Sequence, residues 1–242
     1  MPRFFVNEPL AVGATAVLAG QDARHIASAL RMAVGDTLTL CDGAGTDYTA
    51  TLTAIERERV TLAVSAATPT ASEPSLAVTL YMGLPKGDKM EWIIQKCVEL
   101  GVTAVVPVQT ARCVVRLEER DAAKKQARWQ KIADEAAGQS GRGIRPRVEL
   151  PLSFKAALDR LAQEPTLLCY EGGGAPLGTL VGPADTAVSL VVGPEGGFDP
   201  AELAAVRAVG GRVATLGPRI LRCETAPVAA LAVLMERSGN MQ

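Results

Sequence analysis

Residues 187–235 read AVSLVVGPEGGFDPAELAAVRAVGGRVATLGPRILRCETAPVAALAVLM, and this stretch decides the fold. The apolar run at 187–192 has strand length, and Asp199 followed by Pro200 is typical of a helix N-cap with proline at the first helical position. After two glycines that end this helix, 212–216 predicts a second strand. Ligands of open α/β sheets bind outside the carboxyl ends of strands, so we expect the loops after these two strands to form one pocket.

The first of these loops, GPEGGF at 193–198, does not have the pattern of a phosphate-binding loop. It lacks the GxGxxG and GxxxxGK[ST] spacings, and it contains no lysine to reach a phosphate. Glu195 and Asp199 place carboxylates near a helix N-terminus, where they would repel a phosphate. A ligand with a cationic centre fits better, and S-adenosylmethionine carries a sulfonium. The alternative is that GPEGG is only a tight turn.

The second loop, LGPRILRCETA at 216–226, places two arginines, a glutamate and a helix-capping threonine, Thr225, between a strand and an apolar helix. GPEGGF followed by this loop resembles the RsmE family of the SPOUT superfamily, the 16S ribosomal RNA uracil-N3 methyltransferases. Cys113 and Cys223 depart mildly from the pattern of this family, in which small or hydroxyl-bearing residues would be unsurprising at these two positions. The likeness continues through four further blocks, PRFFV at 2–6, HIASALRMAVGD at 25–36, EWIIQKCVELGV at 91–102 and EAAGQSGR at 135–142.

The resemblance implies a specific reaction, the S-adenosylmethionine-dependent methylation of uracil N3 in 16S ribosomal RNA, at uridine 1498 of the decoding region. Two other functions remain open: a ribose 2′-oxygen RNA methyltransferase of the same fold, and a non-catalytic RNA-binding assembly factor that keeps a vestigial pocket. Binding of S-adenosylmethionine would separate the last from the two enzymes.

Residues 1–70 predict a small separate domain, because short segments rich in threonine and valine alternate apolar and polar residues. The expected strands lie at 3–6, 15–18, 37–41, 47–54 and 60–66, with one helix at 22–30. This pattern suggests a small β-barrel, and the resemblance implies a PUA-like RNA-binding domain. We expect residues 71–75 to be a linker and residues 76–242 to be the methyltransferase domain.

The rest of the chain alternates strand and helix, which predicts an α/β fold with a mostly parallel sheet. The further strands are expected at 76–82, 104–108 and 166–170, and helices at 89–100 and 120–139. General topology rules favour an ordinary doubly wound sheet, whereas the resemblance implies a SPOUT-type sheet with a C-terminal trefoil knot. Residues 226–235 are apolar nearly all round. We therefore expect them to be buried both by the core and by the second subunit of the homodimer that the resemblance implies.

Composition narrows the classes of partner. The formal charge of −1 excludes a uniformly basic coat, so any RNA contact must come from local patches. The five cysteines form no CxxC pair and His25 is the single histidine, which disfavours metal sites and predicts reduced, mostly buried thiols. No apolar run reaches about 18 residues and no signal-peptide pattern opens the chain, so we expect a cytoplasmic protein without membrane association.

The chemistry of uracil N3 indicates which side chains matter. N3 becomes nucleophilic only as its weakly acidic proton leaves, and negative charge then spreads over the two flanking oxygens. An arginine fork suits that anion, so Arg222, and Arg112 from a neighbouring loop, are the catalytic candidates. Glu224 is the candidate proton acceptor, with Glu195 second. The alternative is that Arg219, Arg222 and Glu224 form a structural salt-bridge cluster.

Backbone groups of three loops are expected to hold the cofactor, because glycines allow close approach. The candidate cofactor residues are Leu168, Tyr170, Glu171, Gly193, Pro194, Glu195, Gly196, Gly197, Leu216, Gly217, Ile220, Leu221, Thr225 and Ala226. The candidate RNA contacts, which would grip phosphates and position the RNA, are Arg3, Arg24, His25, Arg31, Lys86 and Arg142. The alternative for the basic residues is a solvated charged rim.

Overall fold

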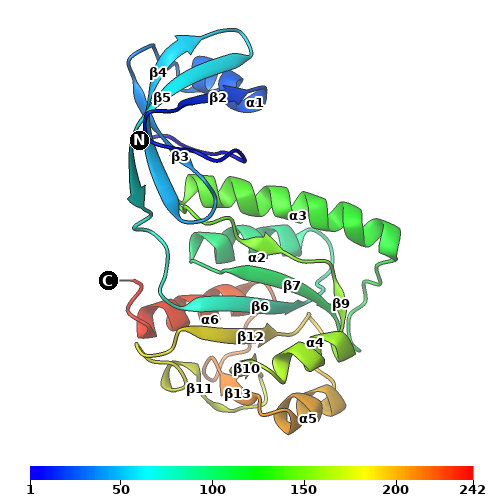
Figure 1. Ribbon diagram of the computed structural model, residues 1–242. Coiled ribbons are helices and arrows are strands. Elements are labelled where there is room, and N and C mark those ends of the chain that lie inside the picture. Colours follow the sequence, from blue (N-terminus) through cyan, green and yellow to red (C-terminus); the bar gives the residue numbers. More distant parts are fainter. Residues whose placement is uncertain (242) are drawn as a thin grey trace. The chain divides into compact units, whose positions relative to one another are not determined.

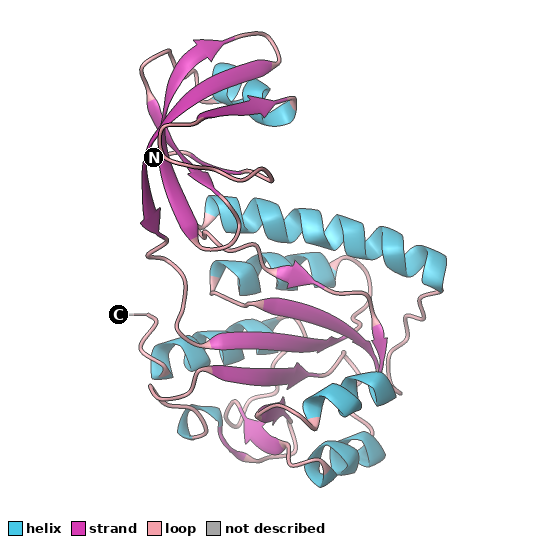
Figure 2. Cartoon of the chain, viewed as in Figure 1, coloured by secondary structure: helices cyan, strands magenta, loops and turns pink. Residues whose placement is uncertain are grey.

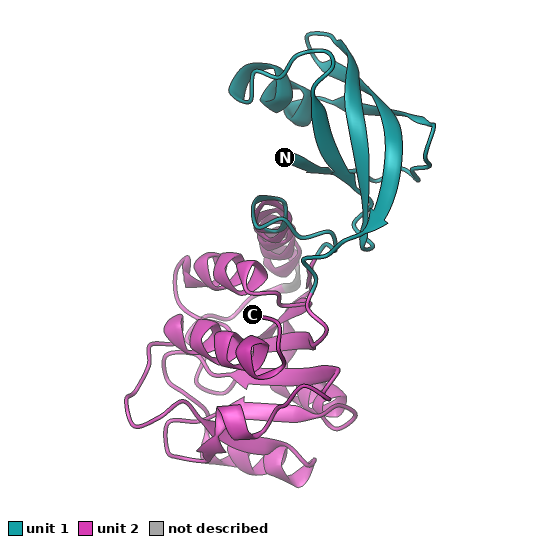
Figure 3. Ribbon diagram, turned by 90° about the vertical axis from the view of Figure 1, so that its left-hand side faces the viewer, with its two compact units in different colours: residues 1–73, 137–145 teal, residues 74–136, 146–242 magenta. Residues whose placement is uncertain are grey.

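The computed structural model describes residues 1–241, leaving out the side chain of residue 119, and divides the chain into two compact units (Figure 3). The first unit contains residues 1–73 and 137–145, and the second contains residues 74–136 and 146–242. The domain bounds expected from the sequence remain a prediction. Each helix within residues 1–241 is too short or too polar to cross a lipid bilayer.

The first unit is built on a five-stranded sheet that curls into a half-barrel (Figure 2). The strand order is β1-β3-β4-β5-β2, and β1 runs parallel to β3 while the other pairs are antiparallel. The strands are β1 (Arg3–Phe5), β2 (Thr15–Ala19), β3 (Thr37–Cys41), β4 (Thr46–Ile55) and β5 (Arg59–Pro69). A helix, α1 (Gln21–Arg24), runs on as the π-helical turn η1 (His25–Ala29). The predicted small β-barrel with one helix is confirmed in this curled form.

The curl of this sheet has a local cause in the pairing of β4 with β5. The register shifts twice, between Thr49 and Ala50 and between Leu52 and Ala54. Such irregularities increase the local twist and bend the strands that carry them. The curled sheet and the helix together enclose an apolar core that includes Phe4, Ile26, Leu38, Leu40 and Leu62.

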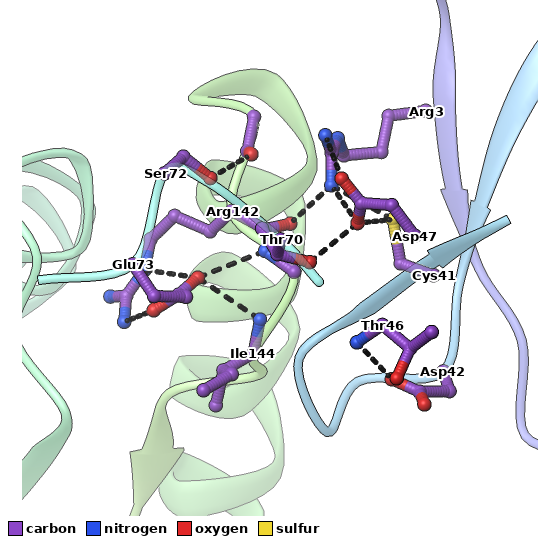
Figure 4. A network of polar contacts seen from close by, with 12 residues as sticks. Arg3, Cys41, Asp42, Thr46, Asp47, Thr70, Ser72, Glu73, Arg142 and Ile144 are labelled. Carbon is purple, nitrogen blue, oxygen red and sulfur yellow. Dashed lines mark hydrogen bonds and ion pairs between the residues drawn. The ribbon is translucent and has the colours of Figure 1, made fainter. Parts of the chain in front are cut away.

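Residues 137–145 belong to the first unit, and hydrogen bonds connect them to Glu73, the last residue of segment 1–73 (Figure 4). The Glu73 carboxylate accepts from the backbone amides of Gly143 and Ile144 at 2.9 and 3.0 Å. The same carboxylate forms an ion pair of 2.7 Å with Arg142, whose side chain is only 4% exposed. Glu73, expected in a linker, is therefore the residue that fastens this segment.

The second unit is an α/β fold around a parallel sheet (Figure 1). The strand order is β11-β13-β10-β12-β6-β7-β8, with β9 also paired to β7, and the pairings are parallel. The strands are β6 (Ala77–Gly83), β7 (Ala104–Gln109), β8 (Arg147–Val148), β9 (Leu152–Ser153), β10 (Thr166–Cys169), β11 (Ala175–Pro176), β12 (Ala187–Val192) and β13 (Arg212–Thr215). The predicted parallel sheet is confirmed.

Helices cover both faces of this sheet (Figure 1). They are α2 (Lys89–Glu99), α3 (Glu119–Gln139), α4 (Phe154–Leu161), the 3-10 turn η2 (Leu177–Thr179), α5 (Pro200–Ala208) and α6 (Thr225–Arg237). On one face α4 and α5 share a core with Tyr81, Leu168 and Val191 of three central strands. On the other face α2 packs against α6, and α2 buries Ile93 and Cys97.

Helix α6 is apolar on two sides, as its sequence predicts. It buries Pro227, Ala230, Leu231, Leu234 and Met235, and leaves Val228, Ala229, Ala232 and Val233 half-buried. The trefoil knot that the resemblance implies for this part of the chain stays a prediction. The five cysteines are free and buried, as predicted.

Candidate functional site

A cavity of about 300 Å³ lies at the carboxyl ends of three neighbouring strands, β12, β10 and β13. The strand-following loops wall it together with the start of α6, in agreement with the rule for open α/β sheets. The lining residues are Cys169, Tyr170, Glu171, Val192, Gly193, Pro194, Glu195, Gly196, Gly197, Phe198, Thr215, Leu216, Gly217, Arg219, Ile220, Leu221, Arg222, Cys223 and Ala226.

The first loop of the cavity needs its glycines for conformation and for space. Gly197 has a φ of +64°, which favours glycine, and a Cβ built there would lie 2.9 Å from the Glu171 carboxylate. A Cβ at Gly193 would lie 3.1 Å from the ring of Phe198. Neighbouring protein atoms therefore leave little room for side chains at these two positions, and the glycines keep the loop closely packed.

The helix that follows this loop begins as the sequence predicts. The Asp199 side chain accepts from the backbone amide of Ala201 at 3.0 Å, and Pro200 is the first helical residue. Glu202 completes a capping box by accepting from the Asp199 amide at 3.0 Å. Its second oxygen accepts from the amide of Ala111 at 2.7 Å, so Glu202 also holds the loop that carries Arg112. Sequence reasoning missed this residue, although the Asp-x-x-Glu spacing signals it.

The second loop turns at Gly217, which has a φ of +100° and donates its amide to the Thr215 hydroxyl at 3.2 Å. The carbonyl of Arg222 then accepts from the amides of Thr225 and Ala226, both at 2.9 Å, and this starts α6. The prediction that Thr225 caps the helix is wrong. Thr225 is the first residue of α6, and Glu224 stands at the cap position without a side-chain capping bond.

An ion-pair cluster joins the two loops. The Nζ of Lys89 lies 3.1 Å from Oε1 of Glu195 and 3.1 Å from Oε2 of Glu224. The Cys223 thiol donates to Glu224 at 3.2 Å and lies 3.7 Å from Lys89. Glu195 accepts a further hydrogen bond of 3.1 Å from the backbone amide of Lys86. The cluster therefore connects the start of α2 with both loops.

These contacts settle the charge states of the cluster. Partial burial would raise the pKa of Glu195, but backbone hydrogen bonds and Lys89 outweigh it and hold that pKa below its usual value. Hydrogen bonds from its own backbone amide and from Cys223, together with Lys89, lower the pKa of Glu224. Burial, with help from Glu224, raises the pKa of Cys223 to about 12. At neutral pH the two carboxylates are ionised and the thiol is neutral.

The catalytic candidates occupy different places. Arg222 is exposed and lines the cavity. Arg112 does not line it, but its guanidinium donates to the carbonyl of Gly196 at 3.2 Å and lies 3.8 Å from Asp199. Glu224 points to Lys89 and is not among the lining residues. The structure thus brings Arg222 to the cavity and Arg112 to the outside of its first loop.

Most of the cofactor candidates line the cavity, with two exceptions. Leu168 is fully buried in the core beneath α4 and α5, and Thr225 is exposed on α6. Ile220, expected to wall the adenine, lines the cavity while its residue is 83% exposed.

Two of the six RNA candidates have guanidinium groups that are already occupied inside the first unit. Arg3 donates to both oxygens of Asp47, at 2.6 and 2.8 Å (Figure 4). Arg142 is buried against Glu73. Because a buried, ion-paired arginine has little surface to offer a phosphate, we leave both out of the RNA surface. Sequence alone could not reveal this, since each partner is distant along the chain.

The other four RNA candidates are exposed. Arg24, His25 and Arg31 lie in the first unit, on or beside α1 and η1, and Arg31 has a φ of +52°. Lys86 lies in the second unit, in the loop between β6 and α2. The exposure of these four side chains allows each of them to contact an RNA phosphate.

Comparisons with protein families agree with this architecture. Residues 72–235 match the model of an RNA methyltransferase domain, and residues 18–65 match that of an RNA methyltransferase PUA domain. Because the first match covers more than half of the chain, the chain belongs to the class of RNA methyltransferases.

Individual relatives narrow the class to one family. The chain is 37% identical to a ribosomal RNA small subunit methyltransferase E of Bacillus subtilis, covering 97% of this chain and 96% of the relative. A Neisseria gonorrhoeae enzyme of that name, crystallised bound to S-adenosyl methionine, is 39% identical with a TM-score of 0.89, covering 98% and 97% of the two chains. A Legionella pneumophila methyltransferase in complex with the same cofactor is 30% identical with a TM-score of 0.85, covering 97% and 96%. The chain belongs to the family of ribosomal RNA small subunit methyltransferase E.

Proposed function

We propose that the cavity binds S-adenosylmethionine and that this chain transfers its methyl group to N3 of uridine 1498 in 16S ribosomal RNA. The observation that carries the proposal is the cavity of about 300 Å³ walled by loops from three adjacent parallel strands. Family membership supports it, because two relatives have been crystallised with that cofactor.

The residues present fit the cofactor. The first loop contributes Gly193, Gly196 and Gly197 to the lining, and glycines leave backbone groups open to a ligand. Glu171 and Glu195 add carboxylates to the wall, which suits a sulfonium. When bound, S-adenosylmethionine supplies an electrophilic methyl group. The loops after β10, β12 and β13 would hold it, mostly through backbone groups.

Arg222 is the residue that we propose to be catalytic. Its exposed guanidinium at the cavity can stabilise the negative charge that develops on the uracil oxygens as N3 loses its proton. Arg112 supports the first loop through the Gly196 carbonyl. The lowered pKa of Glu224 makes this carboxylate a weak base. We therefore propose that charge stabilisation by Arg222, more than proton abstraction by Glu224, accelerates the reaction.

The proposed partners follow from the exposed faces of each unit. Arg24, His25 and Arg31 of the first unit and Lys86 of the second would contact RNA phosphates. The half-buried apolar side chains of α6 would meet a second copy of the chain, which makes the active form a homodimer. Free, buried cysteines and a ribosomal substrate agree with a cytoplasmic location.

Calorimetric titration of the full chain with S-adenosylmethionine tests the proposed cofactor. We expect one binding site per chain, and loss of binding in Gly217→Leu, which adds a side chain to a lining residue whose Cβ meets no atom within 4 Å. The matched control is Gly210→Leu, because Gly210 also has a positive φ, +89° against +100° at Gly217, and open space around its Cβ, but follows the end of α5 and does not line the cavity. A wild-type chain that binds no cofactor would leave the RNA-binding assembly factor as the better account.

A further inference from the structure

Lys89 stands at a position that ordinarily disfavours lysine. It is the first residue of α2, where unpaired backbone N–H groups make the helix end positive. Asp88 at the cap position makes no side-chain capping bond that would offset this. A cation held at the positive end of a helix needs compensating negative charge from elsewhere.

That compensating negative charge comes from the first and second loops of the cavity. Glu195 belongs to the loop after β12, and Glu224 immediately precedes α6, yet both carboxylates lie 3.1 Å from the same Nζ. Glu195 lines the cavity, as does Cys223 next to Glu224, whereas Lys89 does not. Lys89 therefore joins two walls of the cavity from behind, without reaching into it.

The cluster also has a tether that does not depend on the Lys89 side chain. The backbone amide of Lys86 donates to Glu195 at 3.1 Å. A substitution of Lys89 leaves this bond available, together with the buried face of α2. Such variants should consequently fold, and their effect should be confined to the link between the loops.

We propose that Lys89 is a positioning residue of the cofactor site, which fixes the loop after β12 against the start of α6 by pairing with Glu195 and Glu224. The inference rests on the proposed cofactor site. Without the lysine, two ionised carboxylates on facing loops are left next to each other and repel. The walls then part, and cofactor binding weakens. The chemical step is spared, because Lys89 touches neither the cavity nor the reacting atoms.

The test compares the full chain with Lys89→Met, Lys89→Arg and Lys96→Met. Lys96 is a matched control, since it lies on the same helix, pairs with Glu99 at 2.8 Å and has a side chain 33% exposed, against 35% for Lys89. Lys89→Met should raise both the Kd and the KM for S-adenosylmethionine about five- to tenfold, with kcat changed less than about twofold, as expected for two partly exposed ion pairs. Lys89→Arg and Lys96→Met should stay within about twofold of wild type.

A second variant tests the repulsion itself. Glu224→Gln introduced into Lys89→Met removes one of the two carboxylates and should recover at least half of the lost affinity, a coupling that a merely structural role would not produce. Unchanged cofactor affinity in Lys89→Met, or an equal loss in Lys96→Met, would overturn this inference while leaving the proposed function intact. Absence of cofactor binding by the wild-type chain would instead overturn the proposed function.

Discussion

At the scale of single residues, the structure separates arginines that the sequence presents alike. Arg142 and Arg222 both lie in loops rich in polar residues, and the sequence predicts that Arg142 contacts RNA and that Arg222 contacts the substrate base. Arg142 is buried against Glu73, which lies 69 residues away in the chain, whereas Arg222 is exposed at the cavity. Local sequence carries no information about a partner so distant. A buried, ion-paired arginine and an arginine exposed at a cavity therefore cannot be distinguished before the fold is known.

The role of Arg222 predicts a loss confined to the chemical step. We expect Arg222→Ala to lower kcat by about 100-fold or more, because removal of one charge-stabilising donor has an effect of this size. The Kd for S-adenosylmethionine should stay within about twofold, and thermal unfolding should be unchanged. Arg207→Ala on the exposed side of α5 is the control and should be fully active. Normal turnover by Arg222→Ala would end the role we assign to this residue.

The buried ion pair in the first unit predicts a large effect on stability. Arg142→Met leaves the Glu73 carboxylate without its cation, and breaking one side of such a pair costs about 3 to 5 kcal/mol. Urea unfolding of Arg142→Met should show this loss, and Arg142→Met combined with Glu73→Met should recover part of it. Arg24→Met, at an exposed position, should change stability by less than about 0.5 kcal/mol. Equal stability of Arg142→Met and wild type would contradict the structural role.

At the scale of helices and loops, local chemistry was a good guide to where elements begin. Asp199 and Pro200 predicted the start of α5, and the capping box with Glu202 confirms it. The prediction that Thr225 caps α6 is wrong, because the Arg222 carbonyl accepts the first backbone hydrogen bonds of this helix and no side chain caps it. The link from Lys89 to both cofactor loops was also missed. It depends on three segments that meet only in the folded sheet.

In the first loop of the cavity, adding a single methyl group at Gly197 should reduce both stability and cofactor affinity. Gly197→Ala forces alanine into a left-handed conformation and brings its Cβ against Glu171, so we expect about 1 to 2 kcal/mol of destabilisation and at least a tenfold weaker Kd for S-adenosylmethionine. Gly210→Ala has the same kind of strain at a φ of +89°, but open space around it. It should lose stability and keep the Kd. Calorimetry and thermal unfolding of both variants separate the two effects, and equal Kd values would refute a role of Gly197 in cofactor binding.

At the scale of the whole molecule, the alternation of strand and helix was enough to predict the parallel sheet of the second unit. The order β13-β10-β12-β6 could not be read in the same way, because strands distant in sequence become neighbours only through long-range packing. The place of residues 137–145 in the first unit could not be predicted either, because it depends on hydrogen bonds to Glu73, which is distant in sequence. The trefoil knot came only from the family resemblance and remains a prediction.

The most direct measurement is mass spectrometry of 16S ribosomal RNA from cells lacking the gene for this chain. The missing methyl should be on N3 of uridine 1498, and it should return when the wild-type gene, but not Arg222→Ala, is supplied. Recovery of full methylation with Arg222→Ala, or a methyl lost from a ribose 2′-oxygen instead of uracil N3, would contradict the account.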